Sequence, residues 1–125
     1  MKADGHRTIG QLFTGRPAAF RLFGNIRKFI ETLGPVTVEA TKTQVSFGTT
    51  KKFAWVWLPQ MYTKKRPENS ITLTFAAGRH IISDRIAQAV EPRPGTWTHH
   101  VVIEKESDLD DDVKDWIREA FASAK

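Results

Sequence analysis

Residues 51–59 read KKFAWVWLP and are apolar at every position from 53 to 58. Side chains alternate between the two faces of a strand, so a strand of this composition would place apolar groups on both faces of a sheet. Such a strand belongs in the middle of a sheet rather than at its edge. One face would be aromatic and the other aliphatic, with Phe53, Trp55 and Trp57 on the first and Ala54, Val56 and Leu58 on the second.

Further segments with strand-like patterns lie on both sides of this central segment. Residues 36–40 and 43–47 precede it, and both alternate between apolar and polar positions. Residues 70–75 and 97–104 follow it with the same alternation, and residues 86–90 form a weaker candidate between them. Most of the middle of the chain is therefore expected to form a sheet.

Helical patterns occupy the two ends of the chain. A short helical turn is expected within residues 8–17, and Pro17 suits the first position of a longer helix. Gly34 and Pro35 would end that helix, the glycine as a left-handed cap and the proline as a breaker. The apolar residues at helical spacing are Phe20, Phe23, Ile26, Ile30 and Leu33 in this helix, and Val113, Trp116, Ile117, Ala120 and Phe121 near the C-terminus.

The C-terminal helix is expected to begin after Ser107 or Asp108, since either side chain can cap it. The acidic residues that follow suit the positive end of the helix dipole. The order of helix, strands and helix predicts an α+β fold. We expect an antiparallel sheet of about five strands, with the N-terminal and C-terminal helices packed on one face.

Length and composition indicate a small soluble domain. The 125 residues suit a single domain over residues 1–125, with residues 1–7 disordered. The absence of cysteine excludes disulfides, thiolate zinc sites and cysteine nucleophiles. No apolar run is long enough to cross a membrane, and the first residues lack a signal-peptide core. We therefore expect a cytoplasmic protein without membrane contact, whose oligomeric state the sequence leaves open.

The net charge of +5 is unevenly distributed along the chain. Residues 104–125 are acidic, so the rest of the chain is strongly basic. A basic body can attract nucleic acid or an anionic metabolite, although it also serves as a solubilising surface. The basic residues at strand ends and in loops are Lys42, Lys51, Lys52, Lys64, Lys65, Arg66, Arg79, Arg85 and Arg93.

The chain resembles domain-of-unknown-function family 5655 from about Thr8 to Phe121. The resemblance rests on the order of LFTGRP, ETLGPVTVEATKTQVSFGTTKKFAWVWLP, WTHHVVIE and DLDDDVKDWIREAF. Since the function of that family is unsettled, the resemblance implies a fold more than an activity. Members of the family occur alone and attached to other domains, which implies an accessory or binding module.

The adjacent histidines of the segment GTWTHHVVIE would point to opposite faces of the sheet. They therefore do not form a metal site together, and no metal or cofactor is expected. His99 shares its face with Trp97 and with aliphatic residues, so it is either a hydrogen-bonded core residue or a donor in a pocket wall. His100 lies on the more polar face, where it could meet solvent or a ligand.

Whether the sheet offers a binding surface depends on the face on which the side chains of Trp55 and Trp57 lie. We expect both tryptophans to point at the helices together with Phe53, because burial of large apolar area is strongly favourable. The alternative is an open aromatic face on a basic body, which is how several proteins stack the bases of single strands.

No motif of a known enzyme class is present, and the sequence argues against an enzyme. We expect a binding or accessory module for a small anionic or aromatic ligand. The first alternative is a domain that binds single-stranded nucleic acid, and a weaker one is an enzyme with a histidine acid or base. The candidate ligand-binding residues are Lys42, Trp55, Trp57, Arg79, Trp97, His99 and His100.

Overall fold

The computed structural model describes residues 8–41, 43–58 and 70–125, so the expectation of disorder for residues 1–7 lies outside them. The helices are α1 (Ile9–Leu12), α2 (Pro17–Glu31), α3 (Asp111–Ala124) and a 3-10 helix (Glu106–Asp108). The strands are β1 (Thr37–Ala40), β2 (Gln44–Gly48), β3 (Lys52–Trp57), β4 (Ile71–Ala77), β5 (Gln88–Arg93) and β6 (Thr96–Ile103). Each expected strand and helix has a counterpart among these elements.

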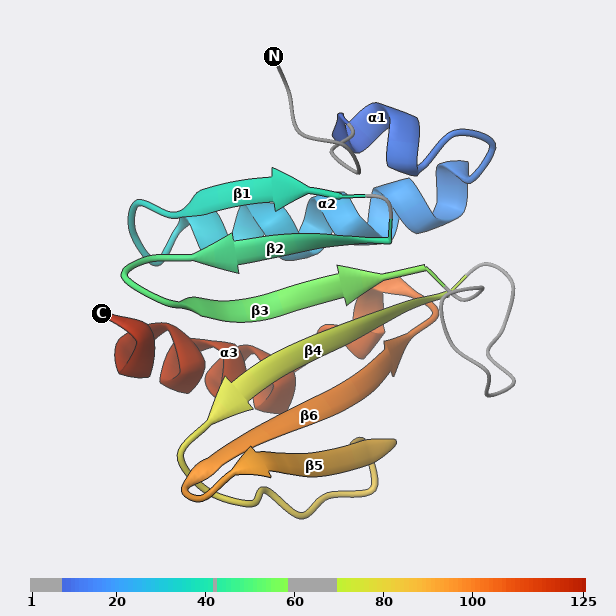
Figure 1. Ribbon diagram of the computed structural model, residues 1–125. Coiled ribbons are helices and arrows are strands. Elements are labelled where there is room, and N and C mark those ends of the chain that lie inside the picture. The colour runs from blue at the N-terminus through green and yellow to red at the C-terminus, as the bar shows by residue number, and fades with distance from the viewer. Residues whose placement is uncertain (1–7, 42, 59–69) are drawn as a thin grey trace.

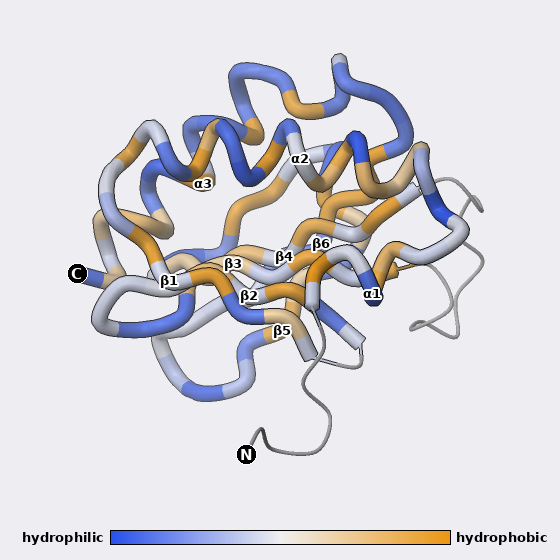
Figure 2. Tube along the Cα trace, turned by 90° about the horizontal axis from the view of Figure 1, so that it is seen from above, coloured by the Kyte–Doolittle hydropathy of each residue, from blue (hydrophilic) through white to orange (hydrophobic). Residues whose placement is uncertain are grey.

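The strands form one antiparallel sheet in the order β1-β2-β3-β4-β6-β5 (Figure 1). β3 and β4 lie at its centre, which confirms the central position predicted from the two apolar faces of β3. Both α2 and α3 pack on the same face of the sheet (Figure 2). None of the described helices covers the other face, which we call the open face. The protein is therefore an α+β domain of the predicted kind.

The core fills the space between the sheet and the two long helices. Phe23 of α2 stacks on Phe47 of β2, with ring centres 6.0 Å apart. Phe75 of β4 stacks on Trp116 of α3, with ring centres 5.8 Å apart. These contacts join β2 to α2 and β4 to α3. The remaining apolar stripe of α3 is buried as predicted, through Val113, Ile117, Ala120 and Phe121.

α3 begins two or three residues later than the sequence predicts, because a single 3-10 turn precedes it. Its cap is therefore Asp110, and the prediction of Ser107 or Asp108 as the cap is wrong. A carboxylate oxygen of Asp110 accepts a hydrogen bond from the backbone N–H of Val113 at 3.1 Å. The same carboxylate forms an ion pair with Arg85, so the cap also holds the connection between β4 and β5 against the helix.

A β-bulge interrupts the regular alternation of β3. Phe47 and Gly48 are consecutive in β2, yet they pair with Ala54 and Lys52 of β3. Phe53 is therefore an extra residue without an opposite partner in β2. Both Phe53 and Ala54 are buried, with 1% and 0% of their surface exposed. The bulge thus places two consecutive side chains on the helix side of the sheet.

The bulge decides where the tryptophans of β3 lie. The Phe53 ring packs edge-on against Phe121 of α3, with ring centres 5.6 Å apart. Trp55 pairs with Thr74, the neighbour of a residue that faces α3, so Trp55 lies on the open face. Trp57 lies two residues further along and shares that face. The expectation that both tryptophans point at the helices is therefore wrong.

Candidate functional site

The two histidines of β6 occupy opposite faces of the sheet. His99 pairs with Phe75, and their rings stack with centres 4.9 Å apart on the helix side. Its ring has no exposed surface, and Nε2 accepts a hydrogen bond from the backbone N–H of Ile81 at 3.0 Å. His100 pairs with Thr74 on the open face. His99 is thus a hydrogen-bonded core residue, and it holds the segment that follows β4.

Burial lowers the pKa of His99, because the charged imidazolium would lose its hydration. The charges of His80 and Arg79 act in the same direction, whereas the backbone of Phe75 and the carboxylate of Glu119 oppose them. The ring is therefore neutral near neutral pH. Since Nε2 accepts a hydrogen bond, the proton of the neutral ring lies on Nδ1.

Two other predicted ligand residues do not join a common site, and a third is not described by the structure. Arg79 donates two hydrogen bonds of 3.0 Å to the carboxylate of Glu119, which therefore matches its charge. Trp97 stacks on His80 with ring centres 4.2 Å apart and nearly parallel planes. Lys42 lies outside the described residues. The cation of Arg79 and one face of the Trp97 ring are already engaged within the protein.

The open face brings the remaining predicted residues together. Trp55, Thr74 and His100 follow one another across three neighbouring strands. Thr74 Oγ1 lies 2.7 Å from His100 Nδ1, a hydrogen bond that fixes the imidazole on the sheet. Trp57 occupies the next row, opposite Thr72. Both threonines are buried, whereas the two indoles beside them are only half-buried. Of the predicted residues, Trp55, Trp57 and His100 share this surface.

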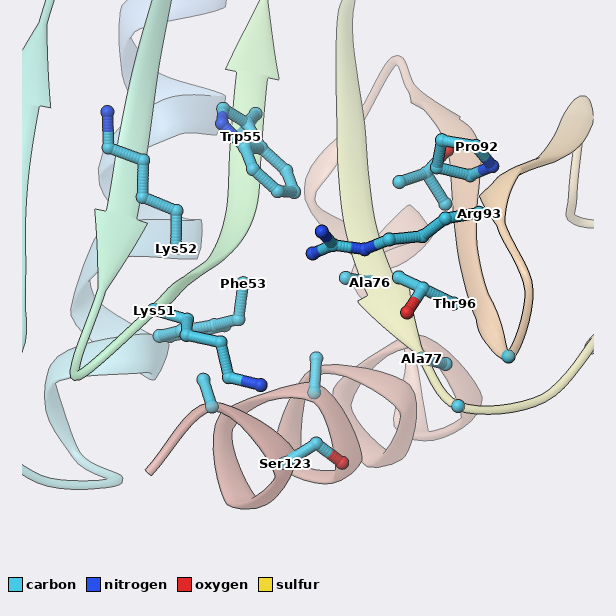
Figure 3. A pocket seen from close by; sticks show the side chains of 15 residues that line it. Lys51, Lys52, Phe53, Trp55, Ala76, Ala77, Pro92, Arg93, Thr96 and Ser123 are labelled. Atoms are coloured by element: carbon cyan, nitrogen blue, oxygen red, sulfur yellow. The ribbon is translucent and has the colours of Figure 1, made fainter.

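A pocket of about 680 Å³ opens at one end of the open face (Figure 3). It lies where β4 continues beyond its last pair with β3 and the C-terminal end of α3 approaches the sheet. Trp55 forms one wall. Across β4, the side chain of Arg93 extends from β5 towards the pocket. The small side chains that leave this volume open include Ala76, Ala77, Ala120 and Ala124.

The charged side chains that line the pocket are all basic. Lys52 is paired with Glu39 at 3.3 Å, so its charge is matched outside the pocket. Neither Lys51 nor Arg93 forms an ion pair with any residue in the described part of the chain. They come from different places in the sequence, the turn before β3 and the end of β5. The pocket therefore combines an aromatic wall with two cations of unmatched charge.

The sequence identified Lys51 and Arg93 only as members of a dispersed basic set. Their proximity depends on the order of the strands, which the residue pattern does not specify. One signal was available for Arg93, since Pro92 and Pro94 restrict the backbone on both sides of it. Thr96, at the start of β6, lines the same pocket and carries no signal of its own.

No group of three or more histidine, aspartate or glutamate side chains among the described residues has an arrangement that could hold a metal ion. None of the described helices combines the length and apolar character needed to cross a bilayer.

Comparisons with known proteins give one match. The model of the family described as "Domain of unknown function (DUF5655)" matches residues 9–124. No curated protein and no solved structure matches the chain. The matched range includes every described helix and strand, and with them both walls of the pocket. The chain belongs to the DUF5655 family, a domain of unknown function.

Proposed function

We propose that this protein is a small binding module that holds an anionic, aromatic ligand in the pocket beside Trp55. The supporting observation is that the half-buried indole of Trp55 lines the same pocket as Arg93 and Lys51, whose charges are unmatched. An aromatic ring of the ligand would stack on Trp55. Its anionic group would accept hydrogen bonds from the guanidinium of Arg93, which suits planar anions. The expectation of a cytoplasmic location stays a prediction.

Calorimetric titration with naphthalene-1-sulfonate tests the proposal, because this probe combines a flat ring with one negative charge. Removal of a charged hydrogen bond costs about 1.5–3 kcal/mol, so Arg93→Ala should weaken binding about 10-fold to 100-fold. Arg21→Ala is the matched control, since Arg21 is an exposed arginine on α2 and outside this pocket. Equal affinity of the two variants, or no binding by the wild type, would contradict the proposal.

The second candidate is a domain that binds single-stranded nucleic acid. It is favoured by one observation, the position of Trp55 and Trp57 on the same open face of β3. Successive bases could stack on the two indoles, with the phosphates near Lys51. Affinity for an oligothymidylate would then fall steeply with salt concentration, whereas a small-ligand pocket predicts little gain from strand length. A salt-independent or absent signal would remove this candidate.

A histidine acid or base is the weakest alternative. His99 already accepts a hydrogen bond from the N–H of Ile81, and its ring meets no solvent. Proton transfer to a substrate requires a ring nitrogen within reach of the reacting group. We therefore assign no catalytic role to this residue.

A further inference from the structure

The number of unmatched charges in the pocket restricts the anionic group of its ligand. Lys51 approaches from the turn before β3, and Arg93 approaches from the end of β5. Lys52 also lines the pocket, but its ammonium forms an ion pair with Glu39. Two cations on separate elements are better matched by a doubly charged group than by a single carboxylate. A phosphate monoester carries this charge at neutral pH and offers three acceptor oxygens.

The C-terminal end of α3 lies close to this proposed anion site. A helix C-terminus carries negative partial charge, which would repel an anion. The carbonyl of Ala124 accepts hydrogen bonds from Thr49 Oγ1 at 2.9 Å and from the backbone N–H of Lys51 at 3.2 Å. These donors reduce the exposed negative charge of the last turn. Because this carbonyl is already engaged, the last turn of α3 is compatible with an anion held by the side chains of Arg93 and Lys51.

The volume and polarity of the pocket restrict the rest of the ligand. A single aromatic ring would occupy a small part of about 680 Å³. Hydroxyl groups of Thr96, Thr98 and Ser123 also line the pocket. Thr98 donates to the carbonyl of Val90 at 3.3 Å, and its oxygen keeps acceptor capacity. The pocket therefore has space and hydrogen-bonding groups for a polar spacer between the ring and the phosphate.

We propose that the ligand is a nucleoside monophosphate, that is, a heteroaromatic base joined through a hydroxylated spacer to a phosphate monoester. The inference rests on the proposed function, since it assigns a ligand class to the same pocket. The base stacks on Trp55, and the phosphate binds Arg93 and Lys51. The polar groups of Thr96 and Ser123 contact the spacer.

The experiment is calorimetric titration of the full chain with AMP, GMP, CMP and UMP, and with the corresponding nucleosides. At least one monophosphate should bind about 10-fold or more tightly than its nucleoside, since charged hydrogen bonds exist only for the phosphate. Arg93→Ala and Lys51→Ala should each remove most of that advantage and leave nucleoside binding unchanged. Arg21→Ala and Lys28→Ala are matched controls on α2 and should retain it. Trp55→Phe should weaken both kinds of ligand.

Three outcomes would overturn the inference and locate its error. If naphthalene-1-sulfonate binds with the expected dependence on Arg93 while no monophosphate binds, the ligand class is wrong and the proposed function stands. If neither probe binds the folded wild type, the proposed function fails as well. If an oligothymidylate binds over 100-fold more tightly than every monophosphate, with steep salt dependence, the site serves a strand rather than a single nucleotide. Thermal unfolding of each variant shows that the compared proteins are folded.

Discussion

The two faces of the sheet are built from alternate residues of the same strands, yet they differ in almost every property. The face under α2 and α3 is apolar and covered, its rings stack on one another, and its histidine in β6, His99, is buried and hydrogen-bonded. The open face carries half-buried indoles, threonines and His100, with unmatched cations at its end. The first face therefore holds the fold together, and the second face is where the proposed ligand would bind.

Neighbouring residues of β6 provide the largest expected contrast between the two faces. Ile103 is fully buried on the helix side, and Ile103→Ala should lower the free energy of unfolding by about 2–5 kcal/mol. Val102 is half-buried on the open face, and Val102→Ala should cost about 1 kcal/mol. Urea unfolding of both variants measures the difference. Similar losses would show that the open face contributes as much to stability as the covered face.

The attachment of α3 to the covered face should be sensitive to its cap. Asp110→Ala removes the acceptor of the Val113 N–H and the ion pair with Arg85, so we expect a loss of about 1–2 kcal/mol in the free energy of unfolding. Asp110→Asn separates the two contributions, because it keeps an acceptor for the cap but removes the charge. An Asp110→Ala variant as stable as the wild type would indicate that packing alone fixes α3.

The buried histidine of the covered face predicts a dependence of stability on pH. The pKa of His99 is lowered by burial from its ordinary value of 6.5, so below that pH the unfolded chain binds more protons than the folded protein. The free energy of unfolding should therefore fall as the pH decreases below 6.5, until the folded pKa is reached. His99→Gln can keep an acceptor for the Ile81 N–H without this titration, and its stability should vary less over the same range. Urea unfolding between pH 5 and 8 compares the two proteins, and equal slopes would contradict the assignment.

The smallest effect is expected for an ion pair beside the pocket. Lys52 and Glu39 are both about half exposed, so Glu39→Gln should change the free energy of unfolding by less than about 0.5 kcal/mol. The same change leaves the charge of Lys52 unmatched and should strengthen binding of an anionic probe slightly. A large loss of stability in thermal unfolding would mean that the open face is held by electrostatics after all.

Local patterns were sufficient to predict the fold because most elements have consistent signals. Pro17 is the first residue of α2, and the two apolar faces of β3 place it at the centre of the sheet. The prediction of Gly34 as the cap is wrong, because α2 ends at Glu31 and its C-cap is Thr32.

The cap of α3 was predicted too early in the chain, because Ser107 and Asp108 are as suitable for capping as Asp110. Only the geometry of the 3-10 turn distinguishes the three residues. The local sequence therefore predicts the presence of each element more reliably than the residue at which it begins.

The candidate site was predicted only in part, for two physical reasons. Trp55 and Trp57 were assigned to the wrong face because strict alternation was assumed through a strand that contains a bulge. Lys51 and Arg93 were not connected to Trp55 because the three residues meet only through the order of the strands. Such long-range proximity leaves no periodic signal along the chain.

Because of the bulge at Phe53, the loss of a single residue at this point could change which side chains of β3 lie on each face of the sheet. A deletion of one residue here has two possible results. Loss of the bulge would keep the pairs of residues 54–57, whereas a retained bulge would shift β3 by one position and exchange the residues on its two faces. In the second case, Trp55 and Trp57 would replace Ala54 and Val56 under the helices. In an alignment of related chains, a one-residue gap between positions 51 and 55 would therefore mark proteins that either lack the bulge or present different residues on the open face.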